Sequence, residues 1–259
     1  MINQPYLNTE YLGFLLDTLK IENKSSAVLN KKIRQAVNYG FDRVKMMKYL
    51  RNNIGVPATK GFIPKGLPSF SENIEGFSYN PDKTRKLLIE AGFPNGEGLS
   101  PITLTTTADY LDLCEYIQQQ LSQFGIEIII NINTGATFRD MVANSKLEFF
   151  RGSWIADYPD AENYLALFYS KNFSPGGPNY THYSNTDFDR LYEKAMLETN
   201  DSLRHLLYQK MNKIIINDAV VVPLYYDEVV RFVNNNISEF ESNPMNLLNL
   251  KYVQKHNQE

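Results

Sequence analysis

The middle of the chain alternates short apolar runs with longer stretches in which apolar residues recur every three or four positions. Between residues 101 and 155 these patterns follow the order strand, helix, strand, helix, strand. Strands that alternate with amphipathic helices are typical of βαβ units. We therefore predict an α/β fold with a parallel or mixed sheet flanked by helices. The elements expected in this region are strands over 102–106, 126–132 and 148–155 and helices over 109–124 and 137–144.

Further elements are expected on both sides of this region. A helix over 30–51 has Asn30 as a suitable N-terminal cap, and Asn80-Pro81 begins a second helix that ends at Gly92. Residues 55–77 are rich in Pro and Gly, which predicts a long irregular loop. The remaining expected elements are strands over 11–14 and 220–226 and helices over 187–198 and 203–217.

The composition argues against several classes of protein. Of the 259 residues, 43% are hydrophobic and 21% are charged, as in soluble globular proteins. The net charge of −3, without a basic stripe, argues against a nucleic-acid partner, and no apolar stretch has the length of a membrane span. The single cysteine, Cys114, excludes an internal disulfide. No signal peptide is visible after Met1, so we expect either a cytoplasmic protein or a sequence that begins downstream of a signal region.

The most informative segment is Phe149 to Asp160, FFRGSWIADYPD, which contains the only Trp of the chain. Its apolar first half predicts a strand that breaks into a loop at Asp157. Arg151, Trp154 and Asp157 then gather at one strand end, where an aromatic wall and a few polar groups often hold a ligand. Because side chains alternate along a strand, Trp154 shares a face with Phe150. The alternative interpretation is a strand-end salt bridge with Trp154 as core filler.

Catalytic and metal sites find little support in the sequence. No two histidines stand at the spacing of a metal site; they are His182, His205 and His256. Cys114 falls in the middle of a predicted helix, which favours a core thiol over a nucleophile. Ser153 lies inside a strand rather than at a helix start, and no Ser/His/Asp or Cys/His set is apparent. We predict no cofactor and no metal, and we keep a small hydrolase as a rival class.

Five motifs in a fixed order point to a known family. The sequence resembles the C-terminal half of family 5 extracytoplasmic solute-binding proteins, the oligopeptide, dipeptide and nickel receptors of ABC importers. The resemblance runs from about residue 11 to residue 252. The matching motifs are KIRQAVNYGFDR (32–43), YNPDKTRKLLIEAGF (79–93), WIADYPD (154–160), YSNTDFD (183–189) and DAVVVPLYY (218–226).

The resemblance implies a two-lobed receptor of which this chain is one part. Residues 1–230 would form the ligand-binding second lobe of a type II periplasmic-binding-protein-like fold, and residues 231–259 a C-terminal tail that returns to a first lobe absent from this sequence. It implies a non-enzymatic, extracytoplasmic receptor, either periplasmic or a membrane-anchored lipoprotein. The signal region would lie outside this sequence. The expected partners are a short peptide and an ABC permease in the membrane, and the expected state is a monomer.

The Trp-x-x-Asp motif allows the roles of single residues to be carried over. In the peptide receptors that this chain resembles, the Asp of the motif pairs with the α-ammonium of the peptide, which implicates Asp157. An Arg three residues before the Trp can take the peptide carboxylate, which implicates Arg151. Main-chain groups of Ser153 and Ile155 would pair with the peptide backbone, and Trp154 would wall a side-chain pocket. The full expected ligand-binding set is Arg151, Ser153, Trp154, Ile155, Asp157 and Tyr158.

The resemblance leaves the ligand open. Receptors for nickel chelates and for oligosaccharides share the fold and much of the outer sequence, so both remain alternatives to peptide. A binding or signalling module that reuses this lobe without transport is a further alternative. The sequence does not indicate a peptide length.

Overall fold

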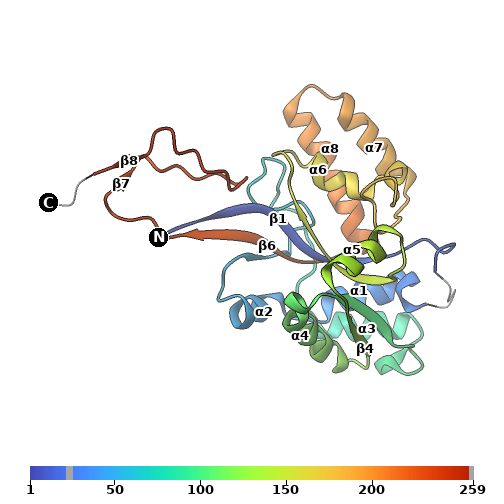
Figure 1. Cartoon of the computed structure of the whole chain (residues 1–259). Coiled ribbons are helices and arrows are strands. Elements are labelled where there is room, and N and C mark those ends of the chain that lie inside the picture. Colours follow the sequence, from blue (N-terminus) through green and yellow to red (C-terminus); the bar gives the residue numbers. More distant parts are fainter. Residues whose placement is uncertain (22–25, 257–259) are drawn as a thin grey trace.

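A computed structural model of the chain describes residues 1–21 and 26–256 and has a six-stranded sheet at its centre (Figure 1). The strand order is β2-β6-β1-β5-β3-β4. β3 pairs in parallel with β4 and β5, whereas β1 pairs antiparallel with β5 and β6, so the sheet is mixed. Its strands are β1 (Ile2–Phe14), β2 (Val56–Pro57), β3 (Ile102–Thr106), β4 (Ile128–Ile132), β5 (Phe149–Ile155) and β6 (Val221–Arg231).

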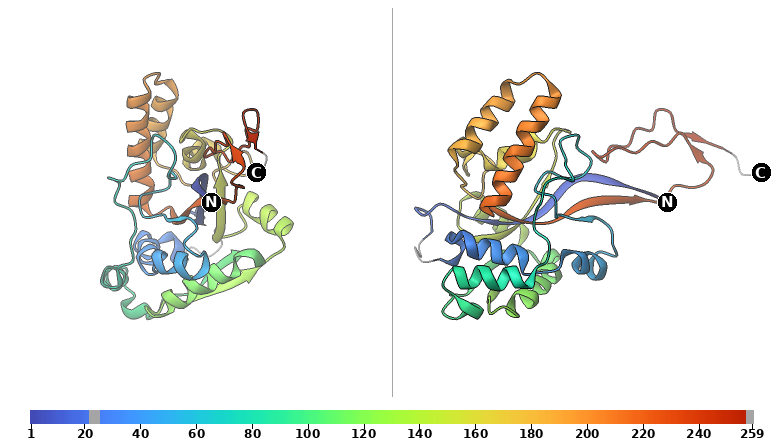
Figure 2. Two further views of the ribbon diagram at one scale, coloured as in Figure 1. Left: turned by 90° about the vertical axis from the view of Figure 1, so that its left-hand side faces the viewer. Right: turned by 180° about the vertical axis from the view of Figure 1, so that it is seen from behind.

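Helices cover both faces of this sheet and produce three layers (Figure 1, Figure 2). The helices α1 to α4 contribute to the core on one face, and α5 to α8 contribute to the core on the other. A short 3-10 turn, η3 (Ala108–Tyr110), leads into α4. The α-helices are α1 (Lys31–Tyr39), α2 (Arg43–Leu50), α3 (Pro81–Glu90), α4 (Leu111–Ser122), α5 (Gly135–Ala143), α6 (Glu162–Leu165), α7 (Thr186–Leu197) and α8 (Asp201–Asp218).

Each face of the sheet has its own apolar core because successive side chains of a strand point to opposite faces. Phe149 stacks on Phe14 with 4.4 Å between the ring centroids, and both side chains are fully buried in the core against α1 to α4. Phe150, the next residue, belongs to the core on the other face. The predicted α/β fold with a mixed sheet flanked by helices is confirmed.

The predicted helix over 30–51 is interrupted, which corrects the sequence-based boundary. Asn30 caps α1 as expected, because its side chain accepts a hydrogen bond from a backbone N–H of the first turn. Asp42 then caps a separate helix, α2, by accepting from the backbone N–H groups two and three residues later. A cap residue has an extended backbone, so a helix cannot continue through it. The apolar spacing runs on through the buried Phe41, and periodicity alone therefore missed the break.

β1 and β6 form a long ribbon that extends beyond the rest of the sheet (Figure 1). The predicted strand over 220–226 is longer than expected and runs to Arg231, which lies opposite Ile2. Beyond it the chain passes through two short strands, β7 (Ile237–Ser238) and β8 (Gln254–Lys255). The carbonyl oxygen of Pro244 accepts a hydrogen bond from the backbone N–H of Leu7 at 2.9 Å, which ties this segment to β1. The division into residues 1–230 and 231–259 stays a prediction.

Candidate ligand-binding site

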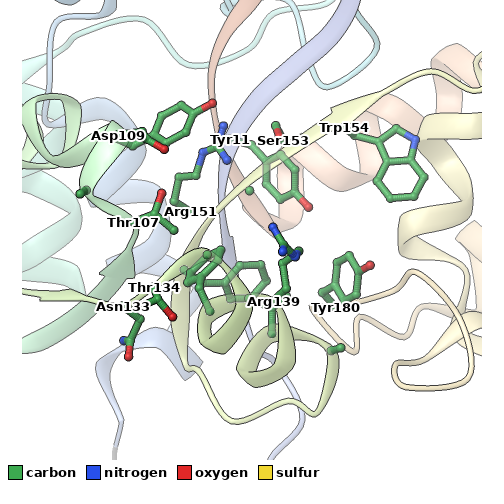
Figure 3. Close-up of a pocket in the computed structure, with 18 residues that line it drawn as sticks. Tyr11, Thr107, Asp109, Asn133, Thr134, Arg139, Arg151, Ser153, Trp154 and Tyr180 are labelled. Atoms are coloured by element: carbon green, nitrogen blue, oxygen red, sulfur yellow. The ribbon is translucent and has the colours of Figure 1, made fainter.

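A cavity of about 650 Å³ lies where β3 and β4 end and β5 continues past them (Figure 3). Thr107 directly follows β3, and Asn133 directly follows β4. The carboxyl ends of parallel strands meet at one edge of a sheet, and ligands of open α/β folds bind in the crevice outside them. The cavity is lined by Tyr11, Thr107, Ala108, Asp109, Tyr110, Asn133, Thr134, Gly135, Phe138, Arg139, Val142, Ala143, Phe150, Arg151, Gly152, Ser153, Trp154 and Tyr180.

β5 forms one wall of the cavity, and most of one edge of this strand is unpaired. Its pairing with β3 covers only its first two residues, whereas its pairing with β1 continues to Ile155. On the β1 side, Glu148 and Ala156 make backbone hydrogen bonds of 2.9 Å just outside the two ends of β5. Because hydrogen-bonded positions alternate along an antiparallel ladder, the backbone N–H and C=O groups of Ser153 and Ile155 point to the opposite edge. That is the edge that β3 leaves open.

Arg151 lines the cavity, but its guanidinium already has an internal partner. It forms a salt bridge with Glu10 of β1, whose side chain is only 4% exposed. It also stacks over the ring of Tyr110, with 3.2 Å between the guanidinium carbon and the ring centroid. Burial raises the pKa of Glu10 above its usual range, and the positive charge of Arg151 opposes that rise. A ligand carboxylate at Arg151 would have to compete with Glu10, and the strand-end salt bridge considered above has Glu10 as its acid.

Asn163 of α6 is hydrogen-bonded to both Trp154 and Asp157, the two named residues of the Trp-x-x-Asp motif. Trp154 lies on the face of Phe150, as predicted, and its indole N–H donates to the Asn163 Oδ1 atom at 2.7 Å. The backbone N–H of Asp157 donates to the same oxygen at 3.3 Å, and the Asn163 amide donates to Asp157 Oδ2 at 3.4 Å. Asp157 is exposed and has no ion-pair partner in the described part of the chain. Its carboxylate is therefore oriented and still available.

The structure brings together part of the predicted set. The cavity is lined by three of the six predicted residues, Arg151, Ser153 and Trp154. The other three are outside the lining and follow Trp154 along the chain; they are Ile155, Asp157 and Tyr158. Two charged lining residues, Asp109 and Arg139, were missed. They lie in segments that follow β3 and β4, and no motif in the sequence marks them. The βαβ pattern was the only signal that could have indicated them. Residues that directly follow parallel strands gather at one edge of the sheet, where ligands bind.

A Ser/His/Asp constellation does occur, which corrects the statement that no such set is apparent. The Nδ1 atom of His182 lies 3.0 Å from Oδ2 of Asp17, and its Nε2 atom lies 2.8 Å from Oγ of Ser145. Nε2 also lies 2.9 Å from the carbonyl oxygen of Ser174. His182 and Ser145 are only 5% and 8% exposed, and neither lines the cavity. A nucleophile needs room for a substrate beside it, so we interpret this set as a buried link between loops.

The cavity offers binding groups rather than reactive ones. In the described part of the chain, no three His, Cys, Asp or Glu residues gather as metal ligands do. Cys114 is buried, and burial raises the pKa of its thiol to about 11, so the reactive thiolate is scarce at neutral pH. The lining residues can bind a ligand through hydrogen bonds, charge pairing and aromatic contacts.

Comparison with known proteins places the chain in a family. Residues 1–176 match the family described as bacterial extracellular solute-binding proteins, family 5 Middle. The chain belongs to this family of solute-binding proteins. Heme-binding protein A of Haemophilus influenzae is 27% identical to this family 5 chain over 229 residues, which are 86% of the chain and 40% of that protein.

Solved structures agree with the fold of this family 5 chain. HbpA2 from Haemophilus parasuis superposes with a TM-score of 0.86 at 21% identity, over 99% of this chain and 50% of that one. The ABC transporter-associated periplasmic binding protein DppA from Helicobacter pylori, in complex with the peptide STSA, has a TM-score of 0.77 at 25% identity. That match covers 88% of this chain and 43% of that one.

The family 5 chain therefore spans about half the length, or less, of the relatives that it matches. Its family is described as extracellular, and its relatives are binding proteins and not enzymes. None of the helices in residues 1–21 and 26–256 is long and apolar enough to cross a membrane.

Proposed function

We propose that this chain is the ligand-binding part of an ABC-importer substrate-binding protein and that it takes short peptides into the cavity beside β5 for uptake. The observation that carries the proposal is the unpaired edge of β5 next to an aromatic-lined cavity. An extended peptide can add to such an edge as a further strand, and its main chain then supplies affinity that does not depend on sequence. Ser153 and Ile155 present the backbone groups for this pairing. The peptide complex of DppA from Helicobacter pylori supports the same ligand class.

The register of the sheet limits the length of the added strand. β3 occupies the edge of β5 up to Phe150, so the open part runs from Arg151 to Ile155. At about 3.4 Å per residue, this edge is roughly 17 Å long. An extended peptide of about two to five residues fits along it before it meets the end of β3.

Asp157 is the expected partner of the peptide ammonium. Its carboxylate stands at the end of the open edge, is held by Asn163, and is exposed. A hydrogen bond to a charged group contributes about 1.5 to 3 kcal/mol net, which is one to two powers of ten in affinity. Asp157 alone therefore cannot produce tight binding, and the main-chain pairing and the aromatic wall at Trp154 must add to it.

The proposal extends to the whole receptor. Residues 1–230 would be its second lobe, and residues 231–259 the tail that returns to the first. In the complete protein the two lobes would close on the peptide outside the cytoplasm, in the periplasm or on a lipid anchor, and a monomer would deliver it to an ABC permease. Because closure by a second lobe is missing, the 259-residue chain alone should bind on the order of millimolar or more weakly.

The experiment uses the only Trp of the chain, Trp154, as a fluorescence reporter inside the site. Peptides of two to five residues are titrated, at up to tens of millimolar, against the chain and against Asp157→Asn. Asp187→Asn is the matched control, because Asp187 is an exposed carboxylate of α7 that lies outside the cavity. N-acetylated peptides lack the α-ammonium, so they test the same contact by a change in the ligand.

We expect N-acetylation and Asp157→Asn each to weaken binding about tenfold or more, and the two changes together to cost little more than either alone. Asp187→Asn should bind like the unchanged chain. If Asp157→Asn weakens the binding of free and acetylated peptides equally, Asp157 does not contact the peptide ammonium. If no peptide binds while nickel chelates or oligosaccharides do, the peptide assignment is wrong and the fold assignment stands.

A further inference from the structure

Three charged side chains line the cavity, and they differ in whether they already have a partner. Arg151 is held by Glu10 and by the ring of Tyr110. Arg139 and Asp109 are exposed, and neither takes part in a hydrogen bond, ion pair or ring contact with the described residues. Arg139 is thus the lining cation that forms no ion pair with any residue in 1–21 and 26–256.

The position of Arg139 is set by a helix that is firmly anchored. Thr134 caps α5 by accepting a hydrogen bond from the backbone N–H of Thr137 at 3.4 Å. Phe138 and Val142 of the same helix are only 8% and 9% exposed, and they fix its rotation against the core. Arg139 follows Phe138 and rises from α5 toward β5 and Tyr180 (Figure 3).

The guanidinium of Arg139 lies back along its own helix. Its Nη1 atom is 3.6 Å from the position that a Cβ atom on Gly135 would occupy, which is ordinary contact distance. A long side chain on a helix leans toward the N-terminal end in this way. The group therefore sits above the first turn of α5, at the carboxyl end of β4, where the cavity opens.

We propose that Arg139, and not Arg151, is the residue that binds the carboxylate of the ligand, and that Arg151 is a positioning residue that stabilises the β1–β5 pair. This inference rests on the peptide-binding function proposed above. A guanidinium has five N–H donors in a planar fork that matches a carboxylate in two parallel hydrogen bonds. Arg139 forms no hydrogen bond within the described part of the chain, whereas Arg151 already binds Glu10 with a terminal nitrogen.

The charges around the two arginines support the same choice. Asp109 lies on the side of Arg151, whereas Arg139 lies between Arg151 and Tyr180 (Figure 3). A carboxylate placed at Arg151 would meet the like charges of Asp109 and Glu10, which oppose it. Tyr180 lies beside Arg139 in Figure 3, and the other lining residues of α5 carry no charge. The ligand favoured by this arrangement is a short peptide whose carboxyl terminus is free.

The test compares each peptide acid with its C-terminal amide, which differs only in the charge at that end. Both are titrated against the chain, Arg139→Gln, Arg151→Gln and the control Arg190→Gln. Arg190 is 74% exposed on α7 and outside the cavity, so its loss controls for net charge. Trp154 fluorescence and calorimetry measure the dissociation constants. Because Arg151→Gln can impair folding, phenylglyoxal labelling of the unmodified chain, mapped by mass spectrometry, gives a second measurement.

We expect the chain to bind the peptide acid about tenfold or more tightly than the amide, because a charge-assisted hydrogen bond contributes at least that much to affinity. Arg139→Gln should abolish this preference by weakening only the acid, and Arg190→Gln should retain it. Phenylglyoxal should label Arg139 faster than Arg151, and the peptide acid should protect Arg139.

Three results would overturn the inference, and they are distinguishable. If Arg139→Gln weakens acid and amide equally, Arg139 shapes the cavity without binding the carboxylate. If the preference survives in Arg139→Gln, or if the ligand protects Arg151 from labelling instead, Arg151 is the carboxylate partner and peptide binding still stands. If neither acid nor amide binds the unmodified chain, the proposed function itself fails, and this inference fails with it.

Discussion

Removing the guanidinium of Arg151 should destabilise the fold by leaving the carboxylate of Glu10 without its cation. The Glu10 side chain is 4% exposed and that of Arg151 is 12% exposed, so the pair is largely shielded from water. Breaking a buried ion pair by removing one partner costs about 3 to 5 kcal/mol. The residual exposure of Arg151 places Arg151→Met near the lower limit, at about 3 kcal/mol.

The double variant separates the orphaned charge from the lost packing. Glu10→Gln combined with Arg151→Met leaves no unpaired charge in the buried site, and such replacements of both partners are often nearly neutral. The double variant should therefore be more stable than Arg151→Met alone by at least about 1 kcal/mol. This non-additivity is the signature of a real pair.

The pH dependence of Arg151→Met has a definite sign. The pKa of Glu10 is already raised by burial, and loss of Arg151 removes the charge that opposes the rise. A carboxyl group whose folded-state pKa is raised contributes stability below its unfolded pKa, and this stability is lost as the pH increases through the folded pKa. The penalty of Arg151→Met should thus be largest at neutral pH and smallest below about pH 4.5.

Urea unfolding followed by far-ultraviolet circular dichroism measures these free energies at low salt, provided that the transitions are two-state. Arg190→Met is the matched control, because its ion pair with Asp187 is 74% and 77% exposed and should contribute less than about 0.5 kcal/mol. If Arg151→Met costs no more than Arg190→Met, Glu10 does not hold Arg151. Arg151 would then be free to bind a ligand carboxylate, and the reasoning that led to Arg139 would be refuted.

Two further predictions concern the framework around the site. Phe149→Ala should cost about 3 to 5 kcal/mol in urea unfolding, because it empties a fully buried position stacked on Phe14, and a loss below about 1 kcal/mol would contradict that packing. Partial burial raises the pKa of Asp17, but hydrogen bonds from His182 and from the backbone outweigh it and lower the pKa overall. A carboxyl group with a lowered pKa contributes stability above its unfolded value of about 4 that is lost as the pH falls through the folded pKa. Unfolding between pH 6 and pH 3 should therefore show a smaller acid loss for Asp17→Asn than for the unchanged chain, and equal losses would exclude this contribution.

Much of the fold follows from local signals that the chain carries in order. Asn30 and Asn80 cap the helices α1 and α3 where the sequence placed them. The alternation of apolar runs and amphipathic stretches predicted the βαβ region, and its strands form the parallel part of the sheet. These features were predictable because capping and periodicity depend on residues that are neighbours along the chain. The break at Asp42 was missed because the competing cap lies inside a continuous apolar pattern.

The candidate site was only partly predictable. The Trp-x-x-Asp motif located the end of β5 as the place of interest, and Ser153 and Trp154 do line the cavity there. The partner of Arg151 was not predictable, because Glu10 is 141 residues away and becomes its neighbour only when β1 pairs with β5. The same holds for His182, which meets Asp17 and Ser145 through three loops that have no common motif.

By itself, the sequence determined the fold class, the family and the strand at which a ligand is expected, because these rest on local patterns and on the order of motifs. The tertiary structure decided which charges remain available. It paired Arg151 with Glu10, left Arg139 and Asp157 without an ion-pair partner among the described residues, and opened the edge of β5 beyond Phe150. Burial and pairing are properties of groups brought together from distant parts of the chain, and only the folded arrangement of the strands specifies them.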